Sequence, residues 1–477
     1  MKIMTHRTYS YELAKDSQII SPLEKELPQF KRYAYQVLAK EVSSISRYFD
    51  RVINWMPNAS QEIFNLVESR QKLNLESGDL SELAQIADTS VILLDGNVNH
   101  STDIQELFES LKGAISRSSR LVAVLYNPYY RMVFSLMNLI GLRRGELPST
   151  FISRSALENL ARLSGFEVCR VQPILQFPFK WFCVGPILNS VLRVVPTVRW
   201  MGFAAVVTLR PIVEETKAPS LSIVVPARNE AGNIENVFSR LKNLEAFPVE
   251  IIFVEGHSKD NTWEQIQEAV RNYQGPFRVS AYQQTGKGKK NAVKEGFERA
   301  TGDLLTILDA DLTMPPEMLI RFYQAYCQGK GDFINGSRLV YPMATGSMQF
   351  LNHLGNIFFA KALSFVTDVQ LTDSLCGTKL VSRRHYQIMN RWCENFGDFD
   401  PFGDFELIFP VAALGLGSID VPVRYEARTY GTTNISRFQH GWQLLRMTLI
   451  GFFTFKMGRM PQFQKSHSSP ASEFKSS

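Results

Sequence analysis

Two aspartates one residue apart stand directly after an apolar run in the second half of the chain. Asp309, Ala310 and Asp311 follow the run 304–308. Carboxylate oxygens are the ligands that Mg²⁺ and Mn²⁺ prefer, and such a cation can bridge to phosphate oxygens and neutralise a diphosphate leaving group. An isolated D-x-D is more often a structural turn, so the segments around it decide whether Asp309 and Asp311 are metal ligands.

Polar clusters follow two earlier apolar runs in the same half. Residues 226–230 read PARNE and residues 255–260 read EGHSKD, each after a short β-branched run that predicts a buried strand. Ligands of parallel sheets bind at the carboxyl ends of the strands. We therefore expect these two clusters and the aspartate pair to meet at one edge of a sheet.

Strands and helices alternate through this half. The patterns predict strands at 221–225, 250–254, 277–282 and 304–308, with helices at 230–244, 262–272 and 290–300 between them. This alternation predicts a parallel sheet covered on both faces. The first half is also α/β, with helical patterns over 24–67, strands at 90–95, 119–126 and 166–171, and helices at 104–115 and 153–164.

Length and composition set the outer bounds. The chain has 477 residues, 45% hydrophobic and 21% charged, which indicates two to four globular domains and excludes collagen and wholesale disorder. Its net charge of +6 permits an anionic partner but does not call for nucleic acid, and we expect none. The five cysteines contain no C-x-x-C pair, which favours a reducing compartment.

The location predicted from these features is cytoplasmic, peripheral at the inner face of a membrane. Residues 1–18 lack the apolar core of a signal peptide, and no run of about 20 residues is apolar enough to predict a spanning helix. Two stretches, 168–213 and 427–472, contain basic and aromatic residues but no Asp or Glu. Such stretches suit an anionic membrane surface, although buried strands and a bundle helix are the alternatives.

The quoted segments carry a family resemblance. The chain resembles inverting family 2 glycosyltransferases of the GT-A fold, especially dolichyl- or polyprenyl-phosphate sugar synthases, in LSIVVPARNEAGNI, IIFVEGHSKDNT, GKGKKNAVKEGFERATGDLLTILDADLTMPPE and INGSR. The resemblance covers about 221–438. It implies a UDP- or GDP-sugar donor, Mg²⁺ or Mn²⁺, inversion at the anomeric carbon, and a polyprenyl phosphate or other lipid-linked acceptor.

The same resemblance assigns the donor site residue by residue. The nucleotide-sugar pocket would be lined by Pro226, Ala227, Asn229, Glu230, Glu255, Lys287, Asp309 and Ala310. Asp311 would hold the metal, with Asp309 on the metal or the nucleotide. Gly256 stands where a second acid is common, which leaves the base of the donor open. Lys287 and Lys289 lie in a glycine-flexed basic loop whose alternative role is that of a solvated surface loop.

Four further residues are the predicted catalytic set. Arg338 and Arg428 match arginines that the resembled enzymes place on phosphate groups, and a guanidinium suits phosphate because it donates two parallel hydrogen bonds. A structural ion pair is the alternative for each arginine. Asp404, and second Glu406, would be the general base for a hydroxyl acceptor. A phosphate acceptor needs no base, and an acid at a helix N-terminus is the alternative role.

The first half contains the segments ADTSVILLDGNVNHSTDIQELFESLKGAISRSSRLVAVLYN, FISRSALENLARLSGFEVCRVQP and VLRVVPTVRWMGFAAVVTLRP. In these segments it resembles a class I methyltransferase, over about 78–211. Such enzymes hold S-adenosylmethionine with a glycine-rich loop after their first strand, yet no glycine precedes Gly78 and no G-x-G-x-G occurs in this half. We therefore expect an incomplete Rossmann-like, non-catalytic domain. The predicted order is a helical region 1–77, the methyltransferase-like domain 78–211, a linker 212–220, the GT-A domain 221–440, an apolar basic segment 441–461 and a disordered tail 462–477.

Two other functions stay open at this point. A bifunctional methyl- and glycosyltransferase would need a cofactor loop that the first half lacks. A nucleotide- or lipid-binding scaffold with a vestigial transferase site would not need Asp311, Arg338, Asp404 and Arg428 to be present together, as they are.

Overall fold

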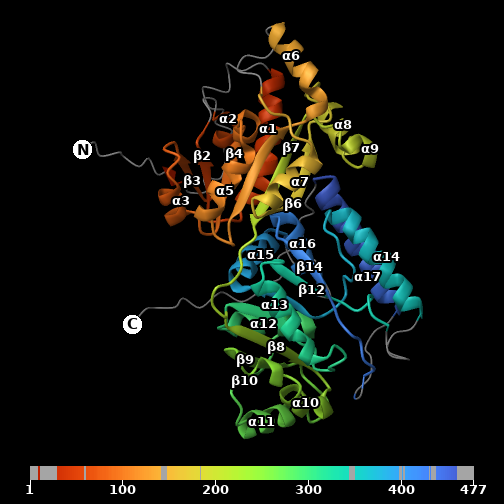
Figure 1. The fold of residues 1–477 in the computed structure, drawn as a ribbon. Coiled ribbons are helices and arrows are strands. Elements are labelled where there is room, and N and C mark those ends of the chain that lie inside the picture. The colour runs from red at the N-terminus through yellow and green to blue at the C-terminus, as the bar shows by residue number, and fades with distance from the viewer. Residues whose placement is uncertain are drawn as a thin grey trace.

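The computed structural model describes residues 9–10, 29–57, 61–140, 148–182, 184–342, 350–396, 400, 403–428, 430 and 437–458. Over these residues the chain forms two α/β units, drawn one above the other in Figure 1, each built on a seven-stranded sheet. The predicted tail 462–477 lies outside the described residues, as does part of the predicted segment 441–461.

The first sheet is parallel in its centre and antiparallel at both sides. Its strands, in the order β1-β3-β2-β4-β5-β7-β6, are Tyr9–Ser10 (β1), Gln71–Leu75 (β3), Arg51–Trp55 (β2), Ser90–Asp95 (β4), Arg120–Tyr126 (β5), Ala204–Pro211 (β7) and Phe166–Ile174 (β6). Strands β3, β2, β4 and β5 run parallel, and β7 runs antiparallel to both of its neighbours. This mixed sheet is the α/β architecture that the sequence predicts.

Helices cover the first sheet. They are Gln29–Ser46 (α1), Glu62–Leu66 (α2), Leu80–Ile86 (α3), Asn97–His100 (α4), Ile104–Ala114 (α5), Arg131–Leu139 (α6), Arg154–Leu163 (α7), Val184–Leu192 (α8) and Pro196–Arg199 (α9). The expectation of a mainly helical region over 1–77 is wrong in one respect. Strands β2 and β3 fall inside it, and β2 pairs with both β3 and β4, so the sheet begins before residue 78. Each has only five residues, too few to stand out beside the longer helical pattern of α1.

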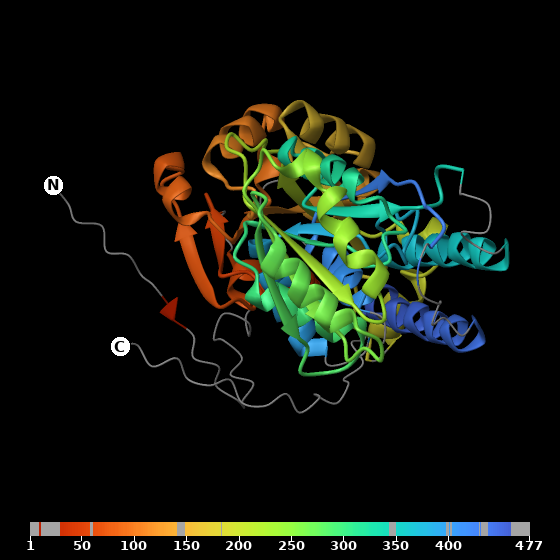
Figure 2. The same ribbon diagram turned by 90° about the horizontal axis from the view of Figure 1, so that it is seen from below.

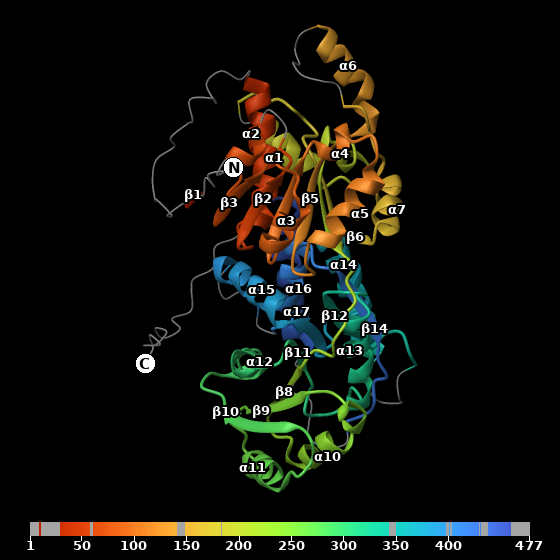
Figure 3. The same cartoon turned by 60° about the vertical axis from the view of Figure 1, so that its left-hand side comes forward.

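The second sheet has the order β10-β9-β8-β11-β13-β12-β14. These strands are Arg278–Gln283 (β10), Val249–Glu255 (β9), Leu221–Ala227 (β8), Leu304–Ile307 (β11), Lys379–Ser382 (β13), Phe333–Ser337 (β12) and Ser418–Pro422 (β14). Strands β10, β9, β8 and β11 are parallel, whereas β13 is antiparallel to β11 and β12. Figure 3 shows β10, β9 and β8 side by side at the far end of the molecule. All four strands predicted in this half are confirmed within one or two residues at most ends.

The helices of the second unit are Ile234–Ser239 (α10), Thr262–Asn272 (α11), Gly288–Arg299 (α12), Leu319–Cys327 (α13), Phe350–Thr367 (α14), Arg383–Phe396 (α15), Phe405–Leu414 (α16) and Arg437–Gly451 (α17), which continues as a π-helical turn Phe452–Lys456. The predicted helix 230–244 is a short α10 flanked by 3₁₀ turns. No helix in the described ranges is both long and apolar enough to cross a membrane.

The two units share a buried interface. Helix α1 of the first unit packs on α16 of the second, and one apolar cluster runs from Phe49 and Val91 to Trp392 and Phe405. The connection between β7 and β8, residues 212–220, coincides with the predicted linker. Because the core is continuous across this junction, the two units form one packed body rather than loosely tethered domains.

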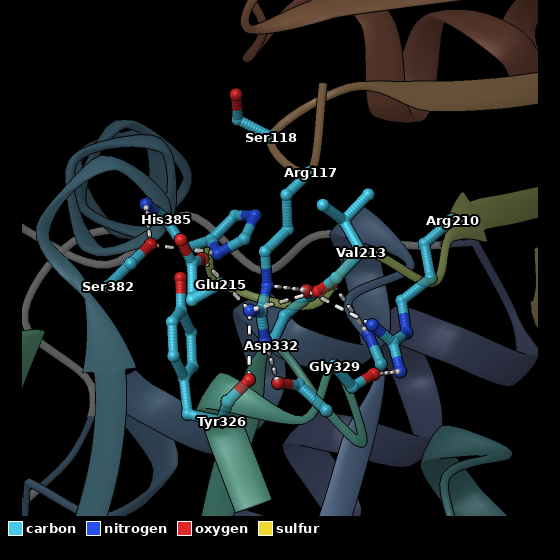
Figure 4. Close-up of polar contacts among 12 residues, drawn as sticks. Arg117, Ser118, Arg210, Val213, Glu215, Tyr326, Gly329, Asp332, Ser382 and His385 are labelled. Atoms are coloured by element: carbon cyan, nitrogen blue, oxygen red, sulfur yellow. Dashed lines mark hydrogen bonds and ion pairs between the residues drawn. The ribbon is translucent and has the colours of Figure 1, made fainter. Parts of the chain in front are cut away.

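A buried carboxylate joins the units at this interface. Asp332, directly before β12, is fully buried and its Oδ2 lies 2.6 Å from Nη2 of Arg120, which opens β5. Its Oδ1 lies 3.4 Å from Nε of Arg117 and 3.4 Å from Nη1 of Arg210. Figure 4 shows Arg117 and Arg210 reaching Asp332 from opposite sides. All three arginines belong to the first unit.

Hydrogen bonds complete this cluster. Arg117 donates to the carbonyls of Tyr326 and Gly331 at 2.9 and 2.7 Å, and Arg210 donates to the carbonyl of Gly329 at 2.9 Å. Burial alone would raise the pKa of Asp332, but the nearby guanidiniums, first that of Arg120, outweigh it and hold this pKa well below its usual range. The carboxylate is therefore charged at neutral pH.

A buried histidine closes the cluster from α15. Nε2 of His385 lies 3.4 Å from Nη2 of Arg120, and its Nδ1 lies 2.9 Å from Oγ of Ser382, both of which are buried with it. Burial lowers the pKa of His385 to about 3, so its ring is neutral at pH 7. A neutral ring adds no further positive charge to a site that already holds three guanidiniums.

Removal of the charge on Asp332 should destabilise the whole chain. Asp332→Asn leaves Arg120 buried without its counter-ion, and breaking a buried pair in this way costs about 3–5 kcal/mol of unfolding free energy. Urea unfolding followed by circular dichroism measures the loss. Asp88→Asn is the matched control, because Asp88 also joins the two units, through Arg384, but the pair is exposed and is worth about 1 kcal/mol or less. Equal midpoints for the two variants would contradict the assignment.

Candidate functional site

The predicted clusters meet at one edge of the second sheet. Strands β9, β8 and β11 are adjacent and parallel, so their carboxyl ends lie together. After β8 the chain turns through Asn229, whose φ of 57° lies in the left-handed region. The Asn229 amide donates to Oγ of Ser258 at 3.0 Å, and Oδ1 of Asn229 accepts from the Lys259 amide at 2.8 Å. These bonds tie the loops after β8 and β9 to each other.

Glu255 ends β9 as a buried carboxylate. Its Oε1 accepts a hydrogen bond from the Ser258 amide at 2.6 Å, and its Oε2 accepts from Nε2 of Gln283 at 3.1 Å. Burial would raise the pKa of Glu255, but these hydrogen bonds, first those of Ser258, keep this pKa below its usual value. The acid is thus an ionised acceptor at the place where the sequence expects a contact with the donor's base. That contact stays a prediction.

The aspartate pair follows β11 and is part of an ordered turn. Oδ1 of Asp311 accepts from the amide and the hydroxyl of Thr313 at 3.1 and 3.0 Å. Its Oδ2 accepts from Nη2 of Arg428 at 2.7 Å. Ala310 between the two aspartates is buried. The turn therefore orients both oxygens of Asp311 and hides the small residue that separates the carboxylates.

Arg428 links the loops that follow β8 and β11. Besides Asp311, its guanidinium donates through Nη1 to Oε1 of Glu230 at 2.8 Å, and the other oxygen of Glu230 accepts from Asn233 at 2.8 Å. Burial raises the pKa of Glu230 above its usual value in spite of Arg428, and the Asp311 charge acts in the same direction. Two carboxylates thus share one cation.

Asp309 is held by a different cation. Its Oδ1 lies 2.5 Å from Nζ of Lys289, near the start of α12. Burial would raise the pKa of Asp309, but Lys289 outweighs it and holds this pKa below its usual range. A Cβ on Gly377 would lie 2.6 Å from the same Nζ and closer still to Oδ2 of Asp309. The ion pair between Lys289 and Asp309 therefore fits in its present position only because residue 377 is a glycine.

The two candidate bases are also paired. Oδ1 of Asp404 lies 2.5 Å from Nζ of Lys379, and Oε1 of Glu406 lies 2.6 Å from Nζ of Lys290. Asp404 occupies the N-cap position of α16, but its side chain makes no capping hydrogen bond. Asp400 does this instead, since its Oδ2 accepts from the amides of Phe405 and Glu406 at 2.7 and 3.0 Å. The role of a helix-capping acid therefore belongs to Asp400.

Arg338 makes a buried ion pair. It follows β12, and its Nε and Nη2 donate to the two oxygens of Asp373 at 2.7 and 2.9 Å. Asp373 also accepts from the amides of Arg338 and Leu375. Burial would raise the pKa of Asp373, but Arg338 holds it below its usual value. This contact corresponds to the structural alternative, and a role for Arg338 on phosphate stays a prediction.

The remaining predicted residues divide by exposure. Ala227 is buried, Pro226 is partly buried, and Lys287 is exposed at the N-cap of α12. Sequence reasoning missed Lys379, Lys290, Asp373 and Asp400 as partners of the predicted acids and arginine. Their signal was the segments GKGKK, TDSLCGTK and GDFD around them, but nothing in the spacing of those segments says which acid each lysine would meet.

The donor set fits a small divalent cation. The described residues contain no group of three or more His, Cys, Asp or Glu side chains arranged to hold a metal. Mg²⁺ commonly takes only one or two protein carboxylates and completes its shell with substrate phosphates and water. Asp309 and Asp311 supply those carboxylates, so the residues present match that mode of binding.

The site belongs to a recognised domain. Residues 222–388 match the model of the family described as Glycosyl transferase family 2. The chain carries a family 2 glycosyl transferase domain. This confirms the resemblance seen in the sequence. The matched range contains β8 to β11, the aspartate pair, Arg338 and Lys379, whereas Asp404, Glu406 and Arg428 lie beyond its end.

Curated relatives cover parts of the same region. The chain is 39% identical over 121 residues to the dolichol-phosphate mannosyltransferase of Pyrococcus furiosus, which is 25% of this chain and 33% of that protein. It is 30% identical over 239 residues to the low-salt glycan biosynthesis hexosyltransferase Agl6 of Haloferax volcanii, 49% of this chain and 54% of that one. The chain thus spans between a third and about half of these relatives.

One solved structure matches this chain at a lower sequence identity than these relatives do. The glucosyl-3-phosphoglycerate synthase of Mycobacterium tuberculosis, in complex with Mn²⁺, UDP-glucose and phosphoglyceric acid, superposes with a TM-score of 0.36 at 20% identity. The match covers 51% of this chain and 81% of that structure.

A methyl group on Gly377 should disturb the site without unfolding the protein. In the Gly377→Ala variant the ends of Lys289 and Asp309 must move apart, and both are side chains that can shift at little cost to stability. We expect UDP or GDP, titrated with Mn²⁺ in a calorimeter, to bind at least about tenfold more weakly. The control is Gly113→Ala in α5, where the new Cβ meets nothing within 4 Å. Unchanged nucleotide affinity in Gly377→Ala would contradict the role of the pair.

Proposed function

We propose that this protein is an inverting, metal-dependent hexosyltransferase that moves a sugar from a UDP- or GDP-sugar to a polyprenyl phosphate or another lipid-linked acceptor. The observation that carries the proposal is the shared cation: Arg428 joins Asp311, after β11, to Glu230, after β8. Asp311 would be the residue that holds the divalent cation, and the cation would then supply the positive charge that Arg428 supplies to this carboxylate here.

The residues of this edge would then divide the work. When bound, the metal supplies Lewis-acid stabilisation of the diphosphate leaving group. Arg428, once it leaves Asp311, can donate its hydrogen bonds to a phosphate, and Lys289 can do the same from Asp309. Glu230 and Glu255 stay as acceptors for the nucleoside. Arg428 and Lys289 thus would neutralise an acid when no substrate is bound and would bind phosphate when the substrate is present.

The acceptor decides whether a base is needed. A sugar hydroxyl must lose a proton as it attacks the anomeric carbon, and Asp404 would accept that proton. The absence of a capping hydrogen bond from its side chain to α16 supports this role. A lipid phosphate is already an anion. Lys379 and Lys290, which hold Asp404 and Glu406, would in that case face the acceptor phosphate. The names of relatives that use dolichol phosphate and undecaprenyl phosphate favour the second case.

The first unit would be a methyltransferase-like domain without activity. Its α/β sheet with a parallel centre supports the resemblance, and the segment after β2 contains no glycine to let a cofactor approach the backbone. Calorimetric binding of S-adenosylmethionine to the full chain would overturn this assignment and favour the bifunctional alternative.

A membrane contact is the last element of the proposal. Large apolar side chains are exposed on Phe179, Trp181, Phe182, Ile187 and Val191 near α8, on Leu354, Phe358 and Phe365 of α14, and on Trp442, Leu445, Leu449 and Phe453 of α17 and its continuation. Figure 1 draws α8, α9, α14 and α17 on one side of the molecule, and Figure 2 keeps α14 and α17 at one side as well. None of these helices contains Asp or Glu. Apolar side chains without acids suit an anionic bilayer surface.

Loss of Asp311 should abolish transfer. Asp311→Ala removes the carboxylate that would hold the metal, and removal of one such electrostatic contact typically costs about 10²–10³ in kcat. Nucleotide release from UDP- and GDP-sugars with Mg²⁺ or Mn²⁺ and polyprenyl phosphate measures it, with Glu268→Ala on the exposed face of α11 as control. Full activity of Asp311→Ala would refute the metal assignment, and absence of release by the wild type with every donor would favour the vestigial scaffold.

The same assay separates the two kinds of acceptor. With a hydroxyl acceptor, Asp404→Asn should lose about 10²–10⁴ in kcat, because no other group takes the proton. With a phosphate acceptor the same variant should keep most of its kcat. A large loss on polyprenyl phosphate would show that Asp404 does more than position the acceptor.

Exposed aromatic residues should govern membrane binding. The double variant Phe358→Ser, Trp442→Ser removes two exposed apolar side chains from α14 and α17 and should leave the protein at the bottom of a flotation gradient with anionic liposomes. The wild type should float, and less so at high salt. Leu163→Ser, an equally exposed apolar site on α7, is the control. Wild-type protein that stays at the bottom would exclude this surface.

A further inference from the structure

A cavity of about 560 Å³ lies between the two units, away from the transferase edge. Its walls come from one face of α1, from α8, and from the second unit's Trp392, Ala413 and Phe455. Ala413 lies near the C-terminal end of α16, whereas Asp404 precedes the N-terminal end of the same helix. The cavity and the predicted catalytic acids are therefore separated by the length of α16.

The cavity wall carries an excess of positive charge. Five basic residues line it, and Glu41 is the single acid among the described lining residues. Glu41 is already bound by Arg170 at 2.7 Å, and Arg47 is paired with Glu68 at 3.2 Å. The other three cations, Lys40, Lys180 and Arg193, make no side-chain hydrogen bond or ion pair within the described part of the chain.

Arg193 is the most constrained of these three cations. Its Nε is buried and finds no hydrogen-bond acceptor among the described residues. A buried guanidinium N–H without an acceptor costs free energy, because the hydrogen bond that it would make to water is not replaced. Gly458, which has a φ of 64°, leaves space beside it, since a Cβ there would lie 3.6 Å from Nη1 of Arg193. An anion in the cavity would supply the missing acceptor.

Apolar side chains form a large part of the remaining wall, beside a few uncharged polar ones. Buried side chains of Tyr33, Leu175, Trp392 and Phe455 face the cavity together with Val37 and Met457. Such a wall would leave the body of a small hydrophilic anion without favourable contacts. A ligand that matches the site has an anionic head and an apolar body.

Helix α8 separates this cavity from the exposed apolar surface. Pro186, Asn189, Ser190 and Arg193 line the cavity, and their spacing places them on one face of the helix. Val184, Ile187 and Val191 are exposed on the other face. Asn189 fixes the helix, because its Nδ2 donates to the Tyr33 hydroxyl at 3.0 Å and to the Phe177 carbonyl at 2.9 Å. An amphiphile that leaves a bilayer would need to pass only one helix to enter the cavity.

We propose that this cavity binds the head and proximal chain of a lipid phosphate. The phosphate would accept hydrogen bonds from Arg193 and lie near Lys40 and Lys180, and the chain would lie against Trp392 and Phe455. This site is distinct from the transferase edge and does not depend on the proposed transfer. It gives the first unit, which contributes α1, α8 and three cations without a partner among the described residues, a binding role of its own.

Calorimetry on the full chain tests the site with dioctanoyl phosphatidate below its micelle concentration. We expect one molecule to bind per chain. Dioctanoylglycerol and inorganic phosphate, which each keep half of the chemistry, should bind at least about tenfold more weakly. Arg193→Gln should weaken phosphatidate binding about tenfold or more, since it removes a charged donor, and Ser190→Phe should block the cavity. Urea midpoints show whether each variant is folded.

Three controls separate this site from its neighbours. Arg162→Gln removes an exposed cation of α7, Ile187→Ser alters the outer face of α8, and Asp311→Ala alters the transferase edge, and all three should bind phosphatidate like the wild type. Wild-type affinity in folded Arg193→Gln would overturn the proposal. So would equal binding of inorganic phosphate, which indicates a simple anion site, or loss of binding in Asp311→Ala, which places the lipid at the transferase edge.

Discussion

The architecture depends on one buried carboxylate among three guanidiniums. Asp332 brings the edge of the second sheet to Arg117, Arg120 and Arg210 of the first unit, and it lies at the start of β12, two strands from the aspartate pair. A charge in this position is tolerated only with its partners in place. The two units therefore hold each other in one orientation, and the helices that both contribute to the exposed apolar side stay aligned.

The ion pairs of the transferase edge differ from the buried Asp332 cluster in size and exposure. The acids and cations of this edge are paired one to one or two to one, through Lys289, Lys290, Lys379 and Arg428. Solvent still reaches part of each pair, although Lys379 itself is buried and only its partner Asp404 is partly exposed. Pairs of this kind are weaker than buried ones and can exchange partners. A diphosphate is negative and its metal is positive. On binding, a cation of the protein could therefore pair with the diphosphate and an acid of the protein with the metal, so that no protein charge would lose its partner.

Much of this edge could be predicted from residue types and order. The runs that became β8, β9 and β11 are β-branched and end in polar residues, and strands of that kind in an alternating α/β pattern must bring Asn229, Glu255 and Asp309 to one edge. The short strands β2 and β3 could not be predicted, because five residues carry too little periodicity to compete with the pattern of α1. The sequence could not show that Asp400 rather than Asp404 caps α16, or that Asp404 pairs with Lys379, because spacing along the chain specifies neither contact.

The sequence by itself determined the α/β class of both halves and the family 2 domain of the second half, since these follow from local patterns and motifs. It also predicted the acids and arginines of a candidate site. Only the tertiary structure decided which cation meets which acid, that three arginines of the first unit close on Asp332, and that α1 and α8 enclose a cationic cavity against Trp392. The physical reason is that ion pairs and cavities form between residues up to several hundred positions apart. Tertiary packing determines which residues pair, and the spacing of residues along the chain does not predict that packing.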